Sequence, residues 1–464
     1  MGRHCALATI VLSAILSASL FAPLACAATP EQAEEKPNAS AKPIVNAKST
    51  KPESELLLLQ KGADQNQVGI SGNPGAENVL TGTGKLGEFL GLKPDSGVRL
   101  GGVVIANADI QMSGRSPGSA TYNAMSIVDL QLDMAKLGHI PGGSFAVTFL
   151  RFDGQNSNER AGVLTGYNGL TETAPLNRSE LYQLWWRQAL FDEKLIVRVG
   201  KSIPTFDFNN VSRRLPIPNE APYVAAVSGL LFTPIYVNPS ILGVMPGYYN
   251  SAWGVTVTAA PTNSFYASYG IYDGSLARGK QTGISVEPTF NSYYLNIGEL
   301  GLSWGGNYPG KFAVGGWGQS GNLGQGKNIE SGAQGVYGTA SNRLMTVRRE
   351  DGSGAVLGYM QYGINNSKTM MVNEFVGGGM AGFGLIPNRP KDSLGLGFAV
   401  SWLNNPPAGQ KTEILTQTYY QAHVIADIFF QPTFSYVPNP GIPNATGGPY
   451  PSATSMIFQV VALF

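Results

Sequence analysis

The chain has 464 residues, of which only 13% are charged, and its 31 Lys and Arg nearly balance its 30 Asp and Glu. This balance gives no overall field that would attract nucleic acid, so we expect no nucleic-acid partner. Because the chain is rich in glycine and has no apolar run of 18 residues after its first 27, it is a large secreted β protein or a transmembrane β-barrel rather than a helical membrane protein.

The first 27 residues have the pattern of an export signal. Arg3 precedes an apolar stretch from Ala6 to Leu24, and the small residues Ala25–Ala27 form a cleavage site. A membrane-anchoring helix is the alternative, but the apolar stretch is short and contains Pro23. We therefore expect residues 1–27 to be a signal peptide.

Removing this leader would remove Cys5 and Cys26, the only two cysteines. A mature chain without cysteine has no disulfide, no thiolate nucleophile and no cysteine-based zinc site. The remaining histidines, His139 and His423, lie far apart and lack the spacing to carboxylates that a metal site needs. The sequence therefore predicts no metal and no other cofactor.

Residues 28–78 differ in composition from the rest of the chain. They contain several prolines and many Lys and Glu, but almost no aromatic residues. Such a segment cannot bury enough apolar surface to fold by itself, so we expect a mobile periplasmic arm. The folded domain would then comprise residues 79–464.

Three glycine-rich motifs resemble nucleotide-binding loops. Gly82–Gly87 fits G-x-G-x-x-G, but a dinucleotide site needs a following helix, and Pro94 and a strand-like run from Val98 follow instead. Gly274–Lys280 and Gly321–Lys327 have the phosphate-loop spacing without the Ser or Thr that should come next. We interpret all three as turns or loops, and with no convincing nucleophile in the chain we predict that it is not an enzyme.

Segments of alternating apolar and polar residues recur along the folded domain. The clearest are residues 125–134, 253–260, 265–272, 394–402 and 420–430. Their less apolar face carries mainly small and amide side chains, which suits the wet interior of a barrel better than the charged exterior of a soluble sandwich. With roughly 24 residues for each strand and its connection, the domain would hold about 16 antiparallel strands.

The connections between these segments are unequal. Phe191–Lys194 is a tight turn, whereas residues 206–249 form a long, apolar connection. Short periplasmic turns and long extracellular loops are typical of outer-membrane barrels. We hypothesise that the long loop folds into the mouth and narrows the pore, where Arg213 and Arg214 would gate it electrostatically or bind lipopolysaccharide phosphate.

In the last nine residues every second position, from Met456 to Phe464, is apolar, and the sequence stops on this aromatic residue. Such a strand is suited to close a barrel against its first strand. We expect this strand to contact outer-membrane lipid and to be recognised by the barrel-assembly machinery.

Strand parity supplies candidates for the pore lining. On one strand, we expect lipid contact from Tyr182, Leu184, Trp186 and Leu190. The inward candidates on this and other strands are Asp129, Asp133, Gln183, Trp185, Arg187, Arg198, Gln421, His423 and Asp427. Amides and charges match sugar hydroxyls, and aromatics match the apolar C–H faces of a sugar. The same charges could instead pair with one another and support the wall, and a one-residue slip would turn Trp185 outward.

Several separated blocks, in order, resemble the OprB-type family of carbohydrate-selective porins. They are Leu80–Gly82, Leu181–Gln188 with Leu195–Gly200, Lys311–Trp317, Gly384–Pro390 with Leu394–Gly397, and Gln431–Gly441. The resemblance implies a 16-stranded barrel in the outer membrane of a Gram-negative cell, through which monosaccharides such as glucose diffuse inward.

Other functions remain open from the residues themselves. A porin of the same build could pass an organic acid or an aromatic solute, and a secreted β-rich binding protein would share the composition. A barrel hydrolase is a further alternative, since His423 and Asp427 share a face. Residues four apart in a strand are about 13 Å apart, however, which is too far for a hydrogen bond.

Overall fold

The structure is a computed structural model, and it describes residues 82–171, 177–209, 211, 238–246, 250–305, 308–325, 328–349, 352–404 and 409–464. The expected signal peptide (1–27) and periplasmic arm (28–78) lie outside the described residues, as do Arg213 and Arg214.

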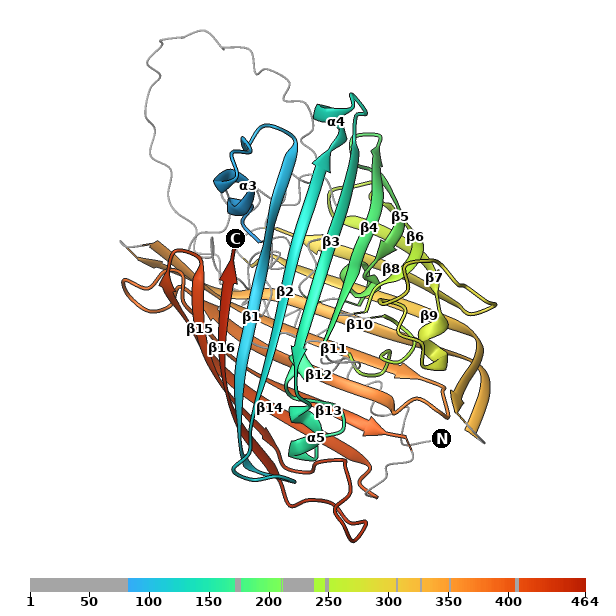
Figure 1. The fold of residues 1–464 in the computed structure, drawn as a ribbon, viewed down its shortest axis with the longest axis vertical. Helices are drawn as coiled ribbons and strands as arrows, with labels where there is room; N and C mark the ends of the chain where they lie inside the picture. Colours follow the sequence, from blue (N-terminus) through green and yellow to red (C-terminus); the bar gives the residue numbers. More distant parts are fainter. Residues whose placement is uncertain are drawn as a thin grey trace, which may run out of the picture. The chain divides into compact units, whose positions relative to one another are not determined.

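Sixteen antiparallel strands close into a barrel, in which each strand pairs with its neighbours in sequence and β1 pairs with β16 (Figure 1). The strands are β1 (Val98–Ser113), β2 (Ala120–Asp133), β3 (Gly143–Gly154), β4 (Arg178–Leu190), β5 (Leu195–Ser202), β6 (Ala252–Ala259), β7 (Phe265–Asp273), β8 (Tyr294–Trp304), β9 (Gly310–Gln325), β10 (Asn328–Arg349), β11 (Gly352–Asn365), β12 (Val372–Phe383), β13 (Ser393–Leu403), β14 (Thr412–Ile425), β15 (Ile428–Val437) and β16 (Ala453–Leu463). The predicted all-β barrel of about 16 strands is confirmed.

The helices in the described part of the chain are short and lie in the connections or before β1. They are α3 (Lys85–Phe89), α4 (Met134–Leu137), α5 (Ser157–Ala161), α6 (Pro204–Asp207) and the 3₁₀ turns η1 (Gly169–Thr171) and η3 (Ser275–Arg278). Within the described ranges, none of the helices has the length and apolar character to cross a bilayer.

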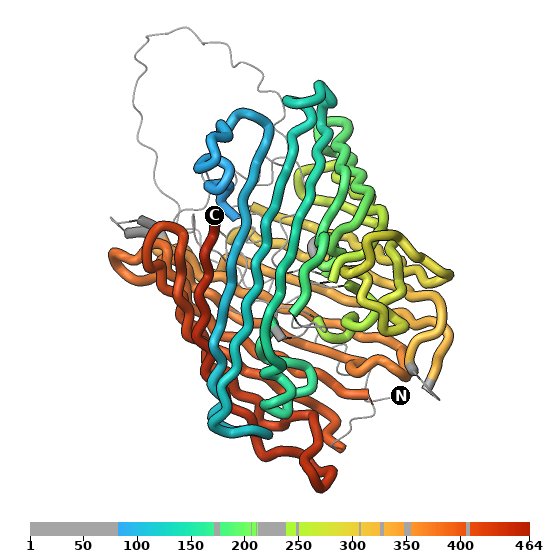
Figure 2. Tube along the Cα trace, in the orientation of Figure 1, coloured from blue at the N-terminus to red at the C-terminus, as the bar shows by residue number. Residues whose placement is uncertain are grey.

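The two ends of the barrel sequence meet at a seam between β1 and β16. The paired residues run from Val103 opposite Leu463 to Ser113 opposite Thr454. Figure 2 shows the first and last strands side by side. The expectation that the last strand closes against the first is therefore confirmed.

Alternating side chains divide the wall into two faces. Val128 is 38% exposed and Phe398 is 39% exposed, whereas the next residues, Asp129 and Ala399, are 2% and 1% exposed. The outer face thus carries large apolar side chains, which lipid solvates. The inner face carries small and polar side chains together with buried apolar ones such as Met125 and Ile127. Of the segments predicted from alternation, residues 125–134, 253–260, 265–272 and 394–402 have the expected faces.

The fifth predicted segment, residues 420–430, is not one strand. β14 ends at Ile425, Ala426 and Asp427 form a turn, and β15 begins at Ile428. Ala426 has a positive φ of 50°, a left-handed conformation that lets the chain reverse direction. Alanine rarely adopts this conformation, so the residue types at this point do not indicate a turn. Apolar residues on both sides of the turn hid it from the alternation pattern.

Tyr182 does not face lipid as its parity predicts. The register of β3 against β4 shifts between Thr148 and Phe149, because β4 has one extra residue at this point. This bulge turns the Tyr182 side chain away from the outer face, and Tyr182 is 0% exposed.

Long connections follow β3, β5, β7 and β15, so in an up-and-down barrel they all lie at the same end. The opposite end carries tight turns such as Phe191–Lys194, together with Phe464. This asymmetry agrees with short periplasmic turns and long extracellular loops.

Candidate functional site

A continuous row of polar side chains crosses the inner wall from β2 to β5. The Thr148 hydroxyl donates to Asp129 Oδ2 at 2.6 Å, and the Gln183 amide donates to the Thr148 hydroxyl at 3.4 Å. The Trp185 indole N–H donates to Gln183 Oε1 at 3.2 Å, and the Arg198 guanidinium carbon lies 5.7 Å from the Trp185 ring centroid. Asp129, Thr148 and Gln183 are direct cross-strand neighbours, which makes the row continuous.

Charged groups extend this row at both ends. The Arg99 guanidinium lies 3.9 Å from Asp129, and Arg198 forms an ion pair with Asp207 of α6. Asp207 also accepts a hydrogen bond from the Tyr272 hydroxyl at 3.3 Å. We call the whole set the polar lane; its members are Arg99, Asp129, Thr148, Gln183, Trp185, Arg198, Asp207 and Tyr272. Gln183, Trp185 and Arg198 are its half-buried members, and the other five are buried and hold these three in place.

Two other predicted residues lie near the lane. Arg187 is 4% exposed, is directly opposite Arg198, and has its guanidinium 3.7 Å from the Glu193 carboxylate in the β4–β5 turn. Asp133 ends β2 and caps α4, because its carboxylate accepts from the Ala135 N–H at 3.0 Å. Arg187 thus belongs to the lumen wall, whereas Asp133 has a capping role in a turn.

The predicted residues of β14 and its turn do not join the lane. Gln421 is 1% exposed and donates to Gln431 Oε1 at 2.9 Å. His423 Nε2 lies 2.6 Å from the Ala426 carbonyl, and Asp427 forms an ion pair with Lys85 of α3. His423 and Asp427 therefore lie at the β14–β15 turn. The sequence predicts that they lie midway along one strand, and this prediction is wrong.

Gln421 belongs to a cluster of amides that sequence reasoning missed in part. Gln417 donates to the Ser435 hydroxyl at 2.8 Å and to the Tyr167 carbonyl at 2.7 Å, and Gln431 donates to the Thr433 hydroxyl at 3.0 Å. The alternation of side chains along residues 412–425 is the sequence feature that indicates this cluster, because Gln417 and Gln421 share one face with Glu413.

The β3–β4 connection folds into the barrel and is held by Glu413 of β14. The Glu413 carboxylate accepts the backbone N–H groups of Leu164 at 2.8 Å, Thr165 at 2.6 Å and Gly441 at 2.6 Å, as well as the Thr165 hydroxyl. Glu413 is 1% exposed. Because β14 lies five strands away from β3 around the barrel, the connection must cross the inner wall of β2, β1, β16 and β15 to reach it.

Tyr167 and Asn168 fix the same connection to β1. The Tyr167 hydroxyl donates to Asp109 at 2.7 Å, and the Asn168 amide lies within hydrogen-bond distance of Asn107 and Asp109. Burial, and next the negative charge of Asp109, raise the pKa of Tyr167 well above its usual range. The phenol therefore stays protonated and remains a donor at alkaline pH.

The described parts of the β5–β6 connection also pack inside the barrel. The Asn209 N–H donates to Glu299 of β8 at 2.8 Å, and Asn365 of β11 donates to the Ser240 carbonyl at 2.7 Å. Glu299 also accepts from the Tyr266 and Tyr337 hydroxyls at 2.6 and 2.8 Å. Both ends of the long connection are thus anchored to the wall, while residues 212–237, with Arg213 and Arg214, lie outside the described residues.

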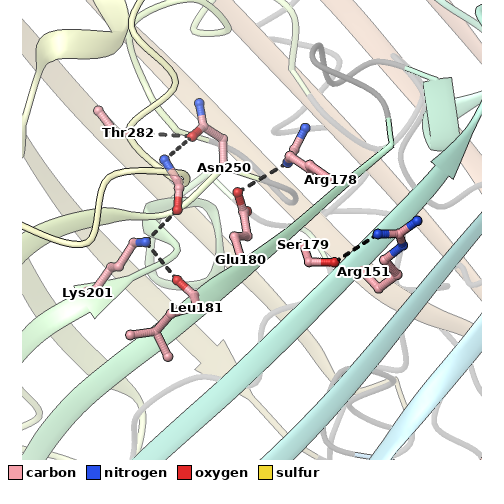
Figure 3. A network of polar contacts seen from close by, with 9 residues as sticks. Arg151, Arg178, Ser179, Glu180, Leu181, Lys201, Asn250 and Thr282 are labelled. Atoms are coloured by element: carbon pink, nitrogen blue, oxygen red, sulfur yellow. Dashed lines mark hydrogen bonds and ion pairs between the residues drawn. The ribbon is translucent and has the colours of Figure 1, made fainter.

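A buried charged cluster ties further connections to β4 and β5 (Figure 3). Arg178 Nε lies 3.2 Å from Glu180, and the Lys201 ammonium donates to the carbonyls of Leu181 and Gly283. Lys201 is 0% exposed. Gly283 belongs to the β7–β8 connection, and its N–H donates to the Asn250 side chain at 2.6 Å. Lys201 therefore holds an extracellular connection against the wall.

Comparison with known protein families identifies the chain. The model of the OprB family of carbohydrate-selective porins matches residues 118–448, which is most of the barrel. The chain belongs to the OprB family. A comparison with curated proteins gave no match.

Solved structures agree with the fold of this porin. The high-pH structure of Pseudomonas putida OprB superposes with a TM-score of 0.67 at 17% identity, covering 83% of this chain and 99% of that one. The low-pH structure of the same protein gives a TM-score of 0.51 at 16% identity, covering 82% and 96%. At these identities the likeness shows a shared fold.

Family and fold together make this protein a carbohydrate-selective porin of the outer membrane. This family and this fold are those of a channel rather than of an enzyme. In the ranges that the structure describes, no group of three or more His, Cys, Asp or Glu residues could hold a metal ion.

Proposed function

We propose that sugars cross this porin in contact with the half-buried members of the polar lane, with Trp185 as the surface on which the sugar ring lies. The edge of the half-buried indole donates to Gln183, and the Arg198 guanidinium lies over the ring, so an aromatic surface stands beside hydrogen-bonding groups. A sugar ring is complementary to this arrangement, because it has apolar C–H faces and hydroxyl groups around its rim. Contacts of this kind are individually weak, which lets the solute leave again.

The first test exchanges the tryptophan for alanine. In Trp185→Ala we expect liposome swelling with glucose to slow by about threefold or more, because the loss of a stacking surface is worth on the order of 1 kcal/mol. Trp186→Ala is the matched control, since Trp186 is the next residue of β4 and lies on the opposite face of the strand. Equal glucose rates in the two variants would move the sugar path away from Trp185.

A second test addresses charge in the lumen. Arg187→Ala should shift the ion selectivity of single channels toward cations and alter sugar flux, because one positive charge leaves the inner wall. Asp129→Ala should shift selectivity the other way. Arg151→Ala is the control, because Arg151 is an exposed arginine paired with Asp153. Heat-shifted migration on gels checks that each barrel assembles; unaltered selectivity in both inner variants contradicts the proposal.

A panel of solutes tests the substrate class. We expect liposomes to swell fastest with a monosaccharide and more slowly with a disaccharide. Swelling should be slowest with an organic or aromatic acid of about the size of the monosaccharide. If an organic or aromatic acid entered faster than glucose, the lane would serve another solute.

We also propose partners and segments outside the lumen. Lipid and lipopolysaccharide would contact the apolar outer face, and the assembly machinery would read β16 with Phe464. Residues 1–27 would be a signal peptide and residues 28–78 a periplasmic arm. We propose no catalytic activity: His423 contacts the Ala426 carbonyl and Asp427 pairs with Lys85, so this pair has other roles.

A further inference from the structure

The glycine motif Gly82–Gly87, which resembles a dinucleotide loop in sequence, has a different ligand in the fold. The backbone N–H groups of Thr83 and Gly84 donate to the main-chain oxygen of Phe464 at 3.1 and 3.2 Å. The Gly102 N–H of β1 donates to the same oxygen at 2.8 Å. Three converging N–H groups form a small concave site of the kind that binds carbonyl or carboxylate oxygens.

Glycine is required at the first position of this site. Gly82 has a φ of +60°, and a Cβ there would lie 2.0 Å from the Gly102 oxygen and 2.5 Å from the Phe464 oxygen. Gly84 also has a left-handed φ, of +82°, but a Cβ there would meet only the flexible Arg99 side chain, at 3.3 Å. Gly102 leaves room for the Phe464 ring, whose atoms would lie 2.9 Å from a Cβ.

Two cationic side chains hold this segment in place. Arg99, a member of the polar lane, donates to the Gly82 carbonyl. Lys85 forms an ion pair with Asp427 in the β14–β15 turn, and the Asp427 carbonyl in turn accepts the Leu463 N–H at 3.0 Å. The segment therefore connects the start of β1, the end of β16 and the neighbouring turn.

We propose that residues 82–85 are a latch that captures the end of β16 and locks the seam of the barrel. The β1–β16 seam is the one strand pair whose members are not consecutive in sequence, so it is closed by the longest loop. A strand pair without a connecting turn can fray from its ends. The latch adds three donors at one such end, where β16 would begin to peel away.

The test compares two glycine substitutions at positions that both have a left-handed φ. Gly82→Ala destroys the latch, whereas Gly91→Ala places alanine at a similar left-handed φ of +88° with nothing within 4 Å of its Cβ. In urea, followed by gel mobility in detergent, we expect Gly82→Ala to unfold at least tenfold faster than the unmodified porin. Gly91→Ala should unfold no more than about threefold faster. Equal unfolding rates for the two variants would overturn the latch.

Hydrogen–deuterium exchange locates the effect in the folded porin. In Gly82→Ala we expect faster exchange in peptides from β16 and from the start of β1, with unchanged exchange in β8 and β9. If Gly82→Ala does not fold, Lys85→Ala is compared with Lys93→Ala, an exposed lysine a few residues away. Lys85→Ala should speed exchange at the end of β16 at least threefold. Exchange there that is as slow as in Lys93→Ala would overturn the proposal.

Discussion

Replacing Glu413 by alanine should open the lumen, with single-channel conductance rising about twofold or more. The carboxylate accepts three backbone N–H groups and one hydroxyl from the β3–β4 and β15–β16 connections. Without it these donors are buried with no acceptor, and each costs about 1–3 kcal/mol. Hydration of the freed segment relieves that cost, so the β3–β4 connection should leave the wall.

Conductance and sugar selectivity in planar bilayers measure this effect. Glu413→Gln keeps one amide oxygen as an acceptor and should give an intermediate conductance. Glu88→Ala removes an exposed carboxylate from α3, outside the barrel wall, and should leave conductance unchanged. If Glu413→Ala conducted like Glu88→Ala, the anchoring role of this carboxylate would be wrong.

Replacing Lys201 by alanine should lower the free energy of unfolding by about 3–5 kcal/mol, the range for breaking a buried charged network. The substitution leaves the carbonyls of Leu181 and Gly283 without their donor, removes a positive charge that acts on Glu180, and leaves a space in the wall. Urea unfolding in detergent measures the loss. The β7–β8 connection should also become accessible to protease near Gly283.

Two further variants separate the causes. Lys201→Met fills the space without donating a hydrogen bond, so it should recover part of the stability but not the protection from protease. Lys194→Ala removes an exposed lysine of the β4–β5 turn and should change neither. Unaltered stability in Lys201→Ala would show that Lys201 does not hold the connection.

The strands were predictable from sequence because their signal is local. Alternation of side chains in residues 253–260 or 394–402 reports directly which face meets lipid. The same parity correctly placed Gln183, Trp185 and Arg187 on one face of β4. It failed at Tyr182, because one extra residue in a strand reverses the parity and leaves no mark in composition.

The anchors of the inward connections were not predictable, because their partners are distant in sequence. Glu413 binds Leu164 from 249 positions away, and Glu299 binds Asn209 from 90 positions away. In sequence, each is a single acidic residue in an apolar or small-residue strand. Only the closed barrel brings these carboxylates against the connections, so a periodicity pattern has no information about them.

The two inward connections are fastened independently. One depends on Glu413 of β14 and the other on Glu299 of β8, and five strands separate these anchors. Each anchor can therefore be changed without touching the contacts that hold the other connection. The lining of the lumen could therefore be altered in steps during evolution or engineering, by loosening one connection while the other keeps its place on the wall.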